Sequence, residues 1–252
     1  MKIINPDLLA CPVFVLTQQY PSYDGVWHQH QRAQLIYASE GLLTVKTEQG
    51  LWVVPPHRAV WIVPGIRHKA CAPKGFHLKT LYVTPEIAPV PTHCCAVTID
   101  PLLDALFSEA ASFGTDYPAA GPQQRLLQVI IDRLAHLQAI PAYLPAPQDA
   151  RLRKLTALLE DNPADARSLT VLASTSGMSD RTAARLFIKE TGITFAQWRQ
   201  QLRLLCAIQL LSQGTSVGNV ADQVGYQDVS SFITVFKKVF GDTPARYLNG
   251  KS

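Results

Sequence analysis

Hydrophobic residues follow two different periods along the 252 residues of the chain. Up to about residue 85, short runs rich in β-branched and aromatic residues are separated by turns that contain glycine or proline. Closely spaced runs of this kind predict β-strands in a small barrel or sandwich. After Asp100, apolar residues instead recur every three or four positions, which predicts amphipathic helices. The β runs are QLIYA, LLTVKT, LWVVP, AVWIV and LKTLYV.

The order of these segments predicts an α+β protein with two domains. We expect a β-barrel domain over residues 1–98, a helical segment over 99–139 and an all-α domain over 149–252. Between them, residues 140–148 (IPAYLPAPQ) contain three prolines, which disfavour helix and predict a linker.

One predicted helix of the segment 99–139 carries an apolar stripe. Such a stripe can pack against the protein's own barrel or against a second copy in a homodimer, and the sequence fits both uses. The stripe consists of Leu126, Leu127, Ile130, Leu134 and Leu137.

Two stretches of the all-α domain repeat one layout. Ala173 and Gly177 in the first stretch correspond to Ala221 and Gly225, 48 residues later. The small alanine allows two helices to cross closely, and the glycine allows the positive φ that a tight corner needs. The residues that cap the helix after each corner are Ser179 and Asp228. This layout predicts two helix-turn-helix motifs, and a connecting helix of about 25–30 Å can hold two recognition helices about one DNA turn apart.

The last hundred residues resemble the AraC/XylS family of bacterial transcription regulators. The resemblance lies in GMSDRTAARLFIKETGITFAQWRQQLRLLCAIQLL and in the following SVGNVADQVGYQDVSSFITVFKKVFGDTPARYL. It implies two helix-turn-helix motifs that bind adjacent major grooves of double-stranded promoter DNA. We also expect a homodimer, with RNA polymerase as a further partner.

Exposed residues early in each recognition helix are expected to face the DNA. Lys237 and Lys238 are expected to contact phosphates. Thr234 stands where the family often has arginine, so the second helix is expected to read fewer bases. The phenylalanines Phe187, Phe232 and Phe236 are expected in the core. The candidates for DNA contact are Ser179, Asp180, Arg181, Thr182, Ala184 and Arg185 in the first helix, and Val229, Ser230, Ser231 and Thr234 in the second.

Three histidines of the barrel domain form a second candidate site. His28 and His30 alternate, so they share one face of a β-strand, and Gln34 joins them if the strand continues. His68 follows the predicted turn VPGIR. The pattern resembles the two motifs of the cupin barrel, which implies a cupin-like sensing barrel. The residues that carry this resemblance are Gly25, His28, His30, Gln34, Gly41, Pro64, Gly65 and His68.

The cupin motifs imply three histidines and a carboxylate around one metal ion, and here Gln34 stands at the carboxylate position. Three interpretations remain open. The four side chains bind a divalent transition metal (Zn, Ni, Fe or Mn), they line a metal-free pocket for a small-molecule effector, or the histidines are structural.

Charge and composition bear on the partners. Residues 1–147 carry 10 basic and 10 acidic side chains, whereas residues 148–252 carry 13 basic and 9 acidic ones, which fits a polyanion partner for the second domain. No apolar run is long enough for a bilayer, and MKIINPDLLACPVF lacks the features of a signal peptide. Five cysteines without a C-x-x-C pair argue against a disulfide framework. We expect a cytoplasmic protein without a membrane partner.

These features together predict a one-component transcription regulator that responds to a ligand or a metal, and not an enzyme. The alternative is a cupin metalloenzyme with a helical appendage. An enzyme of that kind needs a general base or an open metal position, and the barrel segment has few well-spaced carboxylates.

Overall fold

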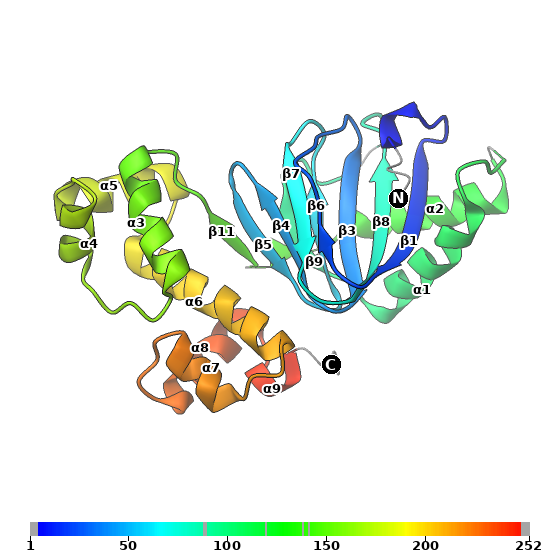
Figure 1. The fold of residues 1–252 in the computed structure, drawn as a ribbon. Helices are drawn as coiled ribbons and strands as arrows, with labels where there is room; N and C mark the ends of the chain where they lie inside the picture. Colours follow the sequence, from blue (N-terminus) through cyan, green and yellow to red (C-terminus); the bar gives the residue numbers. More distant parts are fainter. Residues whose placement is uncertain (1–4, 88–89, 119, 138, 141, 248–252) are drawn as a thin grey trace. The chain divides into compact units, whose positions relative to one another are not determined.

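The chain divides into two compact units in the computed structural model (Figure 1). One unit comprises Met1–Thr47 and Val54–Pro141, and the other comprises Glu48–Val53 and Ala142–Ser252. The structure describes residues 5–87, 90–118, 120–137, 139–140 and 142–247. Six parts of the predicted domains and linker lie outside the described residues, namely 1–4, 88–89, 119, 138, 141 and 248–252.

The first unit contains an antiparallel sheet of six strands in the order β1-β8-β3-β6-β9-β10. Its strands are β1 (Val13–Tyr20), β3 (Ala33–Glu40), β6 (Arg58–Ile62), β8 (Phe76–Val83), β9 (Cys95–Thr98) and β10 (Ala139–Ile140). A second group of antiparallel strands consists of β2 (Tyr23–Asp24), β7 (His68–Ala72) and β4 (Leu43–Thr47), which pair in that order. A short 3-10 helix, η1 (Pro6–Leu8), precedes β1.

Side chains alternate between the two faces of the six-stranded sheet along each strand, so that one face contributes to a hydrophobic core and the other lines a cavity. On β3, Leu35 and Tyr37 belong to a hydrophobic core, whereas Gln34 and Ile36 line a cavity on the opposite face. The same alternation holds on β8, where Leu81 and Val83 belong to the core and Thr80 and Tyr82 line the cavity. This arrangement explains why the β3 sequence AQLIYASE is a nearly continuous apolar run.

Two helices, α1 (Pro101–Ala110) and α2 (Pro122–Leu134), contribute to the same hydrophobic core as this sheet (Figure 1). Asp100 caps α1 by accepting a hydrogen bond from the Leu103 backbone N–H at 2.7 Å, and it also forms an ion pair with Arg133 of α2. A 3-10 turn, η2 (Ala111–Phe113), follows α1. The apolar stripe of α2 packs within its own unit, because Leu127, Ile130 and Leu134 are buried there and Leu126 and Leu137 are partly buried against them.

The segment predicted as a linker differs from that prediction. Ile140 lies in β10, and Tyr143–Pro145 forms β11, which pairs antiparallel with β5 (Gly50–Val54). The indole Nε1 of Trp198 donates to the Pro145 carbonyl at 2.7 Å, and Gln201 Nε2 donates to the Tyr143 carbonyl at 3.1 Å. Backbone pairing and these two side chains therefore order a proline-rich stretch that has no helical or alternating pattern.

The second unit is otherwise helical. Its helices are α3 (Ala150–Asp161), α4 (Leu169–Thr175), α5 (Asp180–Thr191), α6 (Phe195–Ser212), α7 (Val217–Gln223), α8 (Val229–Phe240) and α9 (Pro244–Tyr247). The central helix α6 begins with a capping box between Thr194 and Gln197, and its 18 residues correspond to about 27 Å. No described helix has both the length and the hydropathy needed to span a bilayer.

Candidate functional site

The first unit contains a cavity of about 380 Å³ that is partly open to solvent. At one end, the rings of Tyr20, Tyr23 and Phe76 pack together, with 5.2 Å between the centroids of Tyr20 and Phe76. The rest of the lining includes aliphatic side chains and a polar group formed by the three histidines and Gln34. The aliphatic residues include Leu16, Ile36, Leu43 and Leu78.

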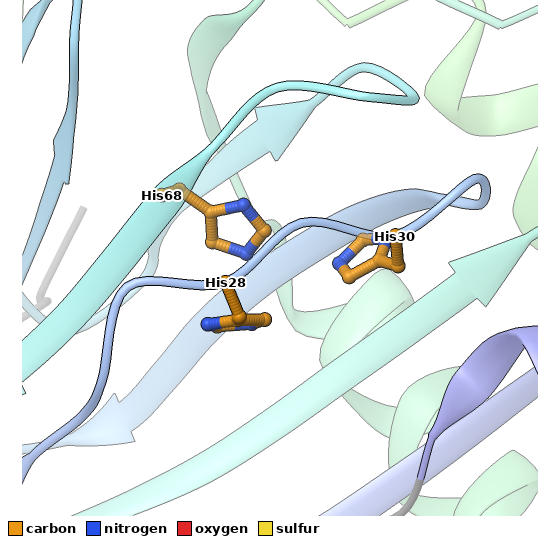
Figure 2. Close-up of side chains that lie close together, drawn as sticks. All are labelled: His28, His30 and His68. Carbon is orange, nitrogen blue, oxygen red and sulfur yellow. The ribbon is translucent and has the colours of Figure 1, made fainter.

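The histidines meet because two separate segments of chain pair with each other (Figure 2). His28 and His68 exchange backbone hydrogen bonds of 3.0 and 2.8 Å across an isolated antiparallel bridge, so their side chains share a face. The backbone carbonyl of His30 accepts from Gly65 N–H at 2.9 Å. The predicted continuous strand from His28 to Gln34 is not formed, since β3 begins only at Ala33.

Each histidine uses its Nδ1 in the same way. The Nδ1–H of His28 donates to the Val26 carbonyl at 3.0 Å, that of His30 to the Arg32 carbonyl at 2.7 Å, and that of His68 to the Ile66 carbonyl at 2.8 Å. A carbonyl oxygen can only accept, so Nδ1 carries the proton in all three rings. In the neutral ring, Nε2 is then left with a free lone pair.

The Gln34 amide is oriented by two hydroxyl groups. Its Nε2 donates to Thr80 Oγ1 and to the Tyr82 hydroxyl, both at 2.9 Å. Thr80 must accept this hydrogen bond, because its own proton goes to the Leu35 carbonyl at 3.0 Å. Gln34 Oε1 consequently faces the two buried histidines.

No proton is available where these groups converge. Gln34 Oε1 lies 3.1 Å from His30 Nε2 and 3.0 Å from His68 Nε2, and all three atoms are acceptors. Burial lowers the pKa of His30, and it lowers the pKa of His68 to about 4, which favours the neutral form of both rings. Unpaired buried acceptors are costly, and a cation placed among them would satisfy all three.

The residues present fit a divalent transition metal. The three histidines offer ring nitrogens that lie within 4.8 Å of one another. Imidazole nitrogen suits Zn, Ni and Fe, and hydrogen bonds from the opposite ring nitrogen to backbone carbonyls are typical of histidines that ligate metal. Gln34 would add an amide oxygen.

The two helix-turn-helix corners have the same geometry. The Met178 N–H donates to the Ala173 carbonyl at 2.9 Å, and the Tyr226 N–H donates to the Ala221 carbonyl at 2.9 Å. Gly177 and Gly225 adopt φ values of +75° and +81°. The predicted repeat of an alanine and a glycine is therefore also a repeat in three dimensions.

The surroundings of the two corner glycines differ, and this difference predicts different effects of alanine. At Gly177 an added Cβ meets nothing within 4 Å, whereas at Gly225 it lies 2.8 Å from the Ala164 Cα. Gly177→Ala is expected to cost about 1–2 kcal/mol from the positive φ alone. Gly225→Ala should cost about 1–3 kcal/mol more, because backbone must move. Denaturant unfolding of both variants measures the difference, and equal losses would contradict it.

The structure places most predicted DNA contacts on the exposed faces of α5 and α8. Of the candidates in the first motif, Thr182 and Ala184 are half-buried, and Ser179 accepts from the Thr182 N–H as the N-cap of α5. The remaining candidates are exposed: Asp180, Arg181, Arg185, Val229, Ser230, Ser231, Thr234, Lys237 and Lys238. The prediction that Phe187, Phe232 and Phe236 are core residues is confirmed, since all three are fully buried.

The sequence-based analysis did not identify one arginine that stabilises the second corner. Arg203 of α6 donates from Nε to the Pro163 carbonyl at 2.9 Å and from Nη1 to the Gly225 carbonyl at 3.1 Å. Its Nη2 also donates to the Asp165 carbonyl at 3.3 Å. This side chain therefore ties the second corner to the loop before α4. An arginine within the apolar run of α6 was the only indication in the sequence.

Comparison with known proteins provides evidence about the barrel cavity and about the helix-turn-helix motifs. Residues 11–90 match a family model described as an AraC-like ligand binding domain, and residues 172–250 match one described as a helix-turn-helix domain. The HTH-type transcriptional regulator NimR of Escherichia coli K12 is 38% identical over 221 residues, which cover 88% of this chain and 81% of NimR. RipA of Corynebacterium glutamicum, also an HTH-type transcriptional regulator, is 39% identical over 108 residues, 43% of this chain and 32% of RipA.

Among solved structures, ToxT of Vibrio cholerae is 13% identical and covers 94% of each chain with a TM-score of 0.41. The matched domains and the relatives define a DNA-binding transcriptional regulator with a ligand-binding domain. The chain belongs to the AraC-type family of helix-turn-helix regulators.

Proposed function

We propose that this protein is a one-component regulator of a bacterial promoter, in which the barrel cavity binds an effector and α5 and α8 enter successive major grooves. The observation that carries this proposal is the repeated corner geometry at Ala173–Gly177 and Ala221–Gly225 in a chain that also contains a cavity with convergent histidines. Effector binding would shift the protein between two arrangements with different affinity for DNA.

The DNA contacts are assigned by exposure and chemistry. Arg181 and Arg185 are exposed and stand one helical turn apart near the start of α5, so they can reach guanine edges or phosphates. The α8 surface offers Val229, Ser230 and Thr234, which suit contacts to thymine methyl groups and recognition of DNA shape.

The polar part of the cavity is proposed to hold one divalent transition metal ion, with Zn, Ni, Fe and Mn as candidates. His28, His30 and His68 would supply ring nitrogens and Gln34 its Oε1. The convergence of acceptors without a proton favours this interpretation over a metal-free pocket or purely structural histidines. The ion would provide a positive centre inside the cavity, while the Nδ1–H bonds to backbone carbonyls hold the rings in place.

We further propose a homodimer that acts in the cytoplasm, with RNA polymerase as a partner at the promoter. Because the α2 stripe is buried within its own unit, a dimer would use other side chains of α1 and α2. Leu102 and Val129, with 54% and 46% of their surface exposed, are apolar residues available for it.

The alternative of a cupin metalloenzyme finds few carboxylates that could act as a general base. Among the described residues that line the cavity, Asp7 is the single carboxylate. Both of its oxygens accept from the Gln31 backbone N–H, at 3.0 and 2.9 Å. If the three histidines hold a metal ion, no free carboxylate remains among the described lining residues to act as a general base, so the cavity favours binding.

Selection of genomic DNA fragments by the full-length protein tests the regulator proposal. A small set of enriched fragments is expected, with protection over two adjacent major grooves on one face of the duplex. Enrichment no greater than that of random DNA would overturn the proposal.

The pair Lys237 and Lys238 provides a separate prediction. Replacing both with glutamine should weaken binding to specific and random DNA alike and lower the slope of log K against log salt by about two, because each phosphate contact releases about one counterion. Titrations over a range of salt concentrations measure this slope. A slope that stays at the wild-type value would exclude these lysines as phosphate contacts.

A further inference from the structure

The charge of the groups in the cavity indicates what kind of effector it binds. This inference rests on the metal ion proposed above. His28, His30 and His68 are neutral ligands, and Gln34 is a neutral amide where a carboxylate would supply a negative charge. A divalent ion held by these four groups would keep its full charge of about +2.

Little else in the cavity can offset that charge. Among its described lining residues, Asp7 is the single carboxylate, and it is exposed and bonded to the Gln31 backbone. The Gln34 and Thr80 side chains are buried, so water screens the ion poorly on that side. His28 is exposed, so water reaches the ion on that side, but a charge that is only partly screened is still costly. An anionic group on the effector would therefore be favoured next to the ion.

The other walls of the cavity indicate the chemistry of the rest of the effector. The aromatic end at Tyr20, Tyr23 and Phe76 and the aliphatic side chains Leu16 and Ile36 offer apolar contact. No lysine or arginine is among the described lining residues, so a second anionic group such as a phosphate would find no partner. A cavity of about 380 Å³ is near the lower end of ligand pockets, and it suits a molecule with a single ring.

We propose that the effector is a small organic monoanion with an apolar, one-ring body, and that Gln34 selects for the anion by leaving the metal's charge uncompensated. The anionic group binds beside the histidines, and the ring lies toward Tyr20 and Phe76. Metal and effector then bind cooperatively, because each raises the affinity for the other.

Calorimetric titration of the full-length protein with matched pairs of ligands tests the inference. The probes are benzoate with benzamide, and phenylacetate with phenylacetamide, which differ mainly in charge. With Zn²⁺ or Co²⁺ bound, at least one of the two acids is expected to bind about 10-fold or more tightly than its amide, and this preference should disappear after the metal is removed. The absorption spectrum of Co²⁺ should change on addition of the acid.

Gln34→Glu tests the role assigned to the amide. The variant should bind Zn²⁺ at least as tightly as the wild type, yet it should bind the acids about 10-fold or more weakly. Gln18→Glu is the matched control, since Gln18 lines the same cavity but bonds to Tyr20, with 2.8 Å between Oε1 and the hydroxyl. Gln18→Glu should weaken binding of the acids less than Gln34→Glu does.

The results of these experiments distinguish the effector inference from the proposed metal site and from the proposed regulator. Amides that bind as tightly as acids, acids that do not bind, or acid binding that is unchanged in Gln34→Glu would overturn this inference and leave the metal site and the regulator in place. If the wild type takes up no metal, both the inference and the metal site fail, whereas selection of genomic DNA still decides the regulator. The comparison of acid with amide uses the wild type, so it holds even if Gln34→Glu does not fold.

Discussion

Arg185→Ala is expected to weaken binding to the specific promoter about 5- to 150-fold, which corresponds to about 1–3 kcal/mol. Arg185 is exposed on α5, one turn after Arg181, and its guanidinium can donate two hydrogen bonds to one guanine. Alanine removes both donors and leaves the guanine acceptors without a partner. Binding to random DNA should fall much less, so the ratio of specific to random affinity decreases.

Lys189→Ala is the matched control for this experiment. Lys189 is also an exposed basic residue of α5, but it lies in the last turn of the helix. Its loss should change specific and random binding to a similar small extent. A footprint and a specificity ratio that remain at wild-type values in Arg185→Ala would refute a base contact by Arg185.

His68→Ala is expected to abolish stoichiometric metal binding. His68 is only 1% exposed, and its Nε2 lies beside Gln34 Oε1, so alanine removes a ligand from the centre of the group. After equilibration with Zn²⁺ and gel filtration, elemental analysis should find about one ion per wild-type chain and far less in the variant.

The control for metal binding is His93→Ala, because His93 is exposed and outside the cavity. It should retain the metal content of the wild type. Thermal unfolding adds a second measurement, since Zn²⁺ should raise the melting temperature of the wild type and of His93→Ala, but not of His68→Ala. Equal metal content in His68→Ala and the wild type would refute the site.

Much of the fold could be predicted because its determinants are local. The change of period near Asp100 separated strands from helices, and all of the β runs named from the sequence overlap observed strands. The eight-residue strand β1 (VFVLTQQY) was not named, and the other missed strands, such as β2 (YD) and β9 (CAVT), are short and have no clear alternation. Their pairing partners define them more than their own composition does, since a strand is stabilised by cross-strand neighbours.

The sequence by itself determined the class of protein. The spacing from Ala173 to Gly177, repeated at Ala221 and Gly225, specifies a sharp corner because only glycine adopts its positive φ without strain. Tertiary structure alone decided what the barrel site can bind. Pairing of His28 with His68 joins residues 40 positions apart, and the bonds of Gln34 to Thr80 and Tyr82 turn its oxygen toward the imidazoles. Tertiary structure also decided that Arg203 bonds to the second corner and that β11 pairs with β5. Hydrogen bonds between segments that are distant in the sequence produce no periodic pattern that could predict them.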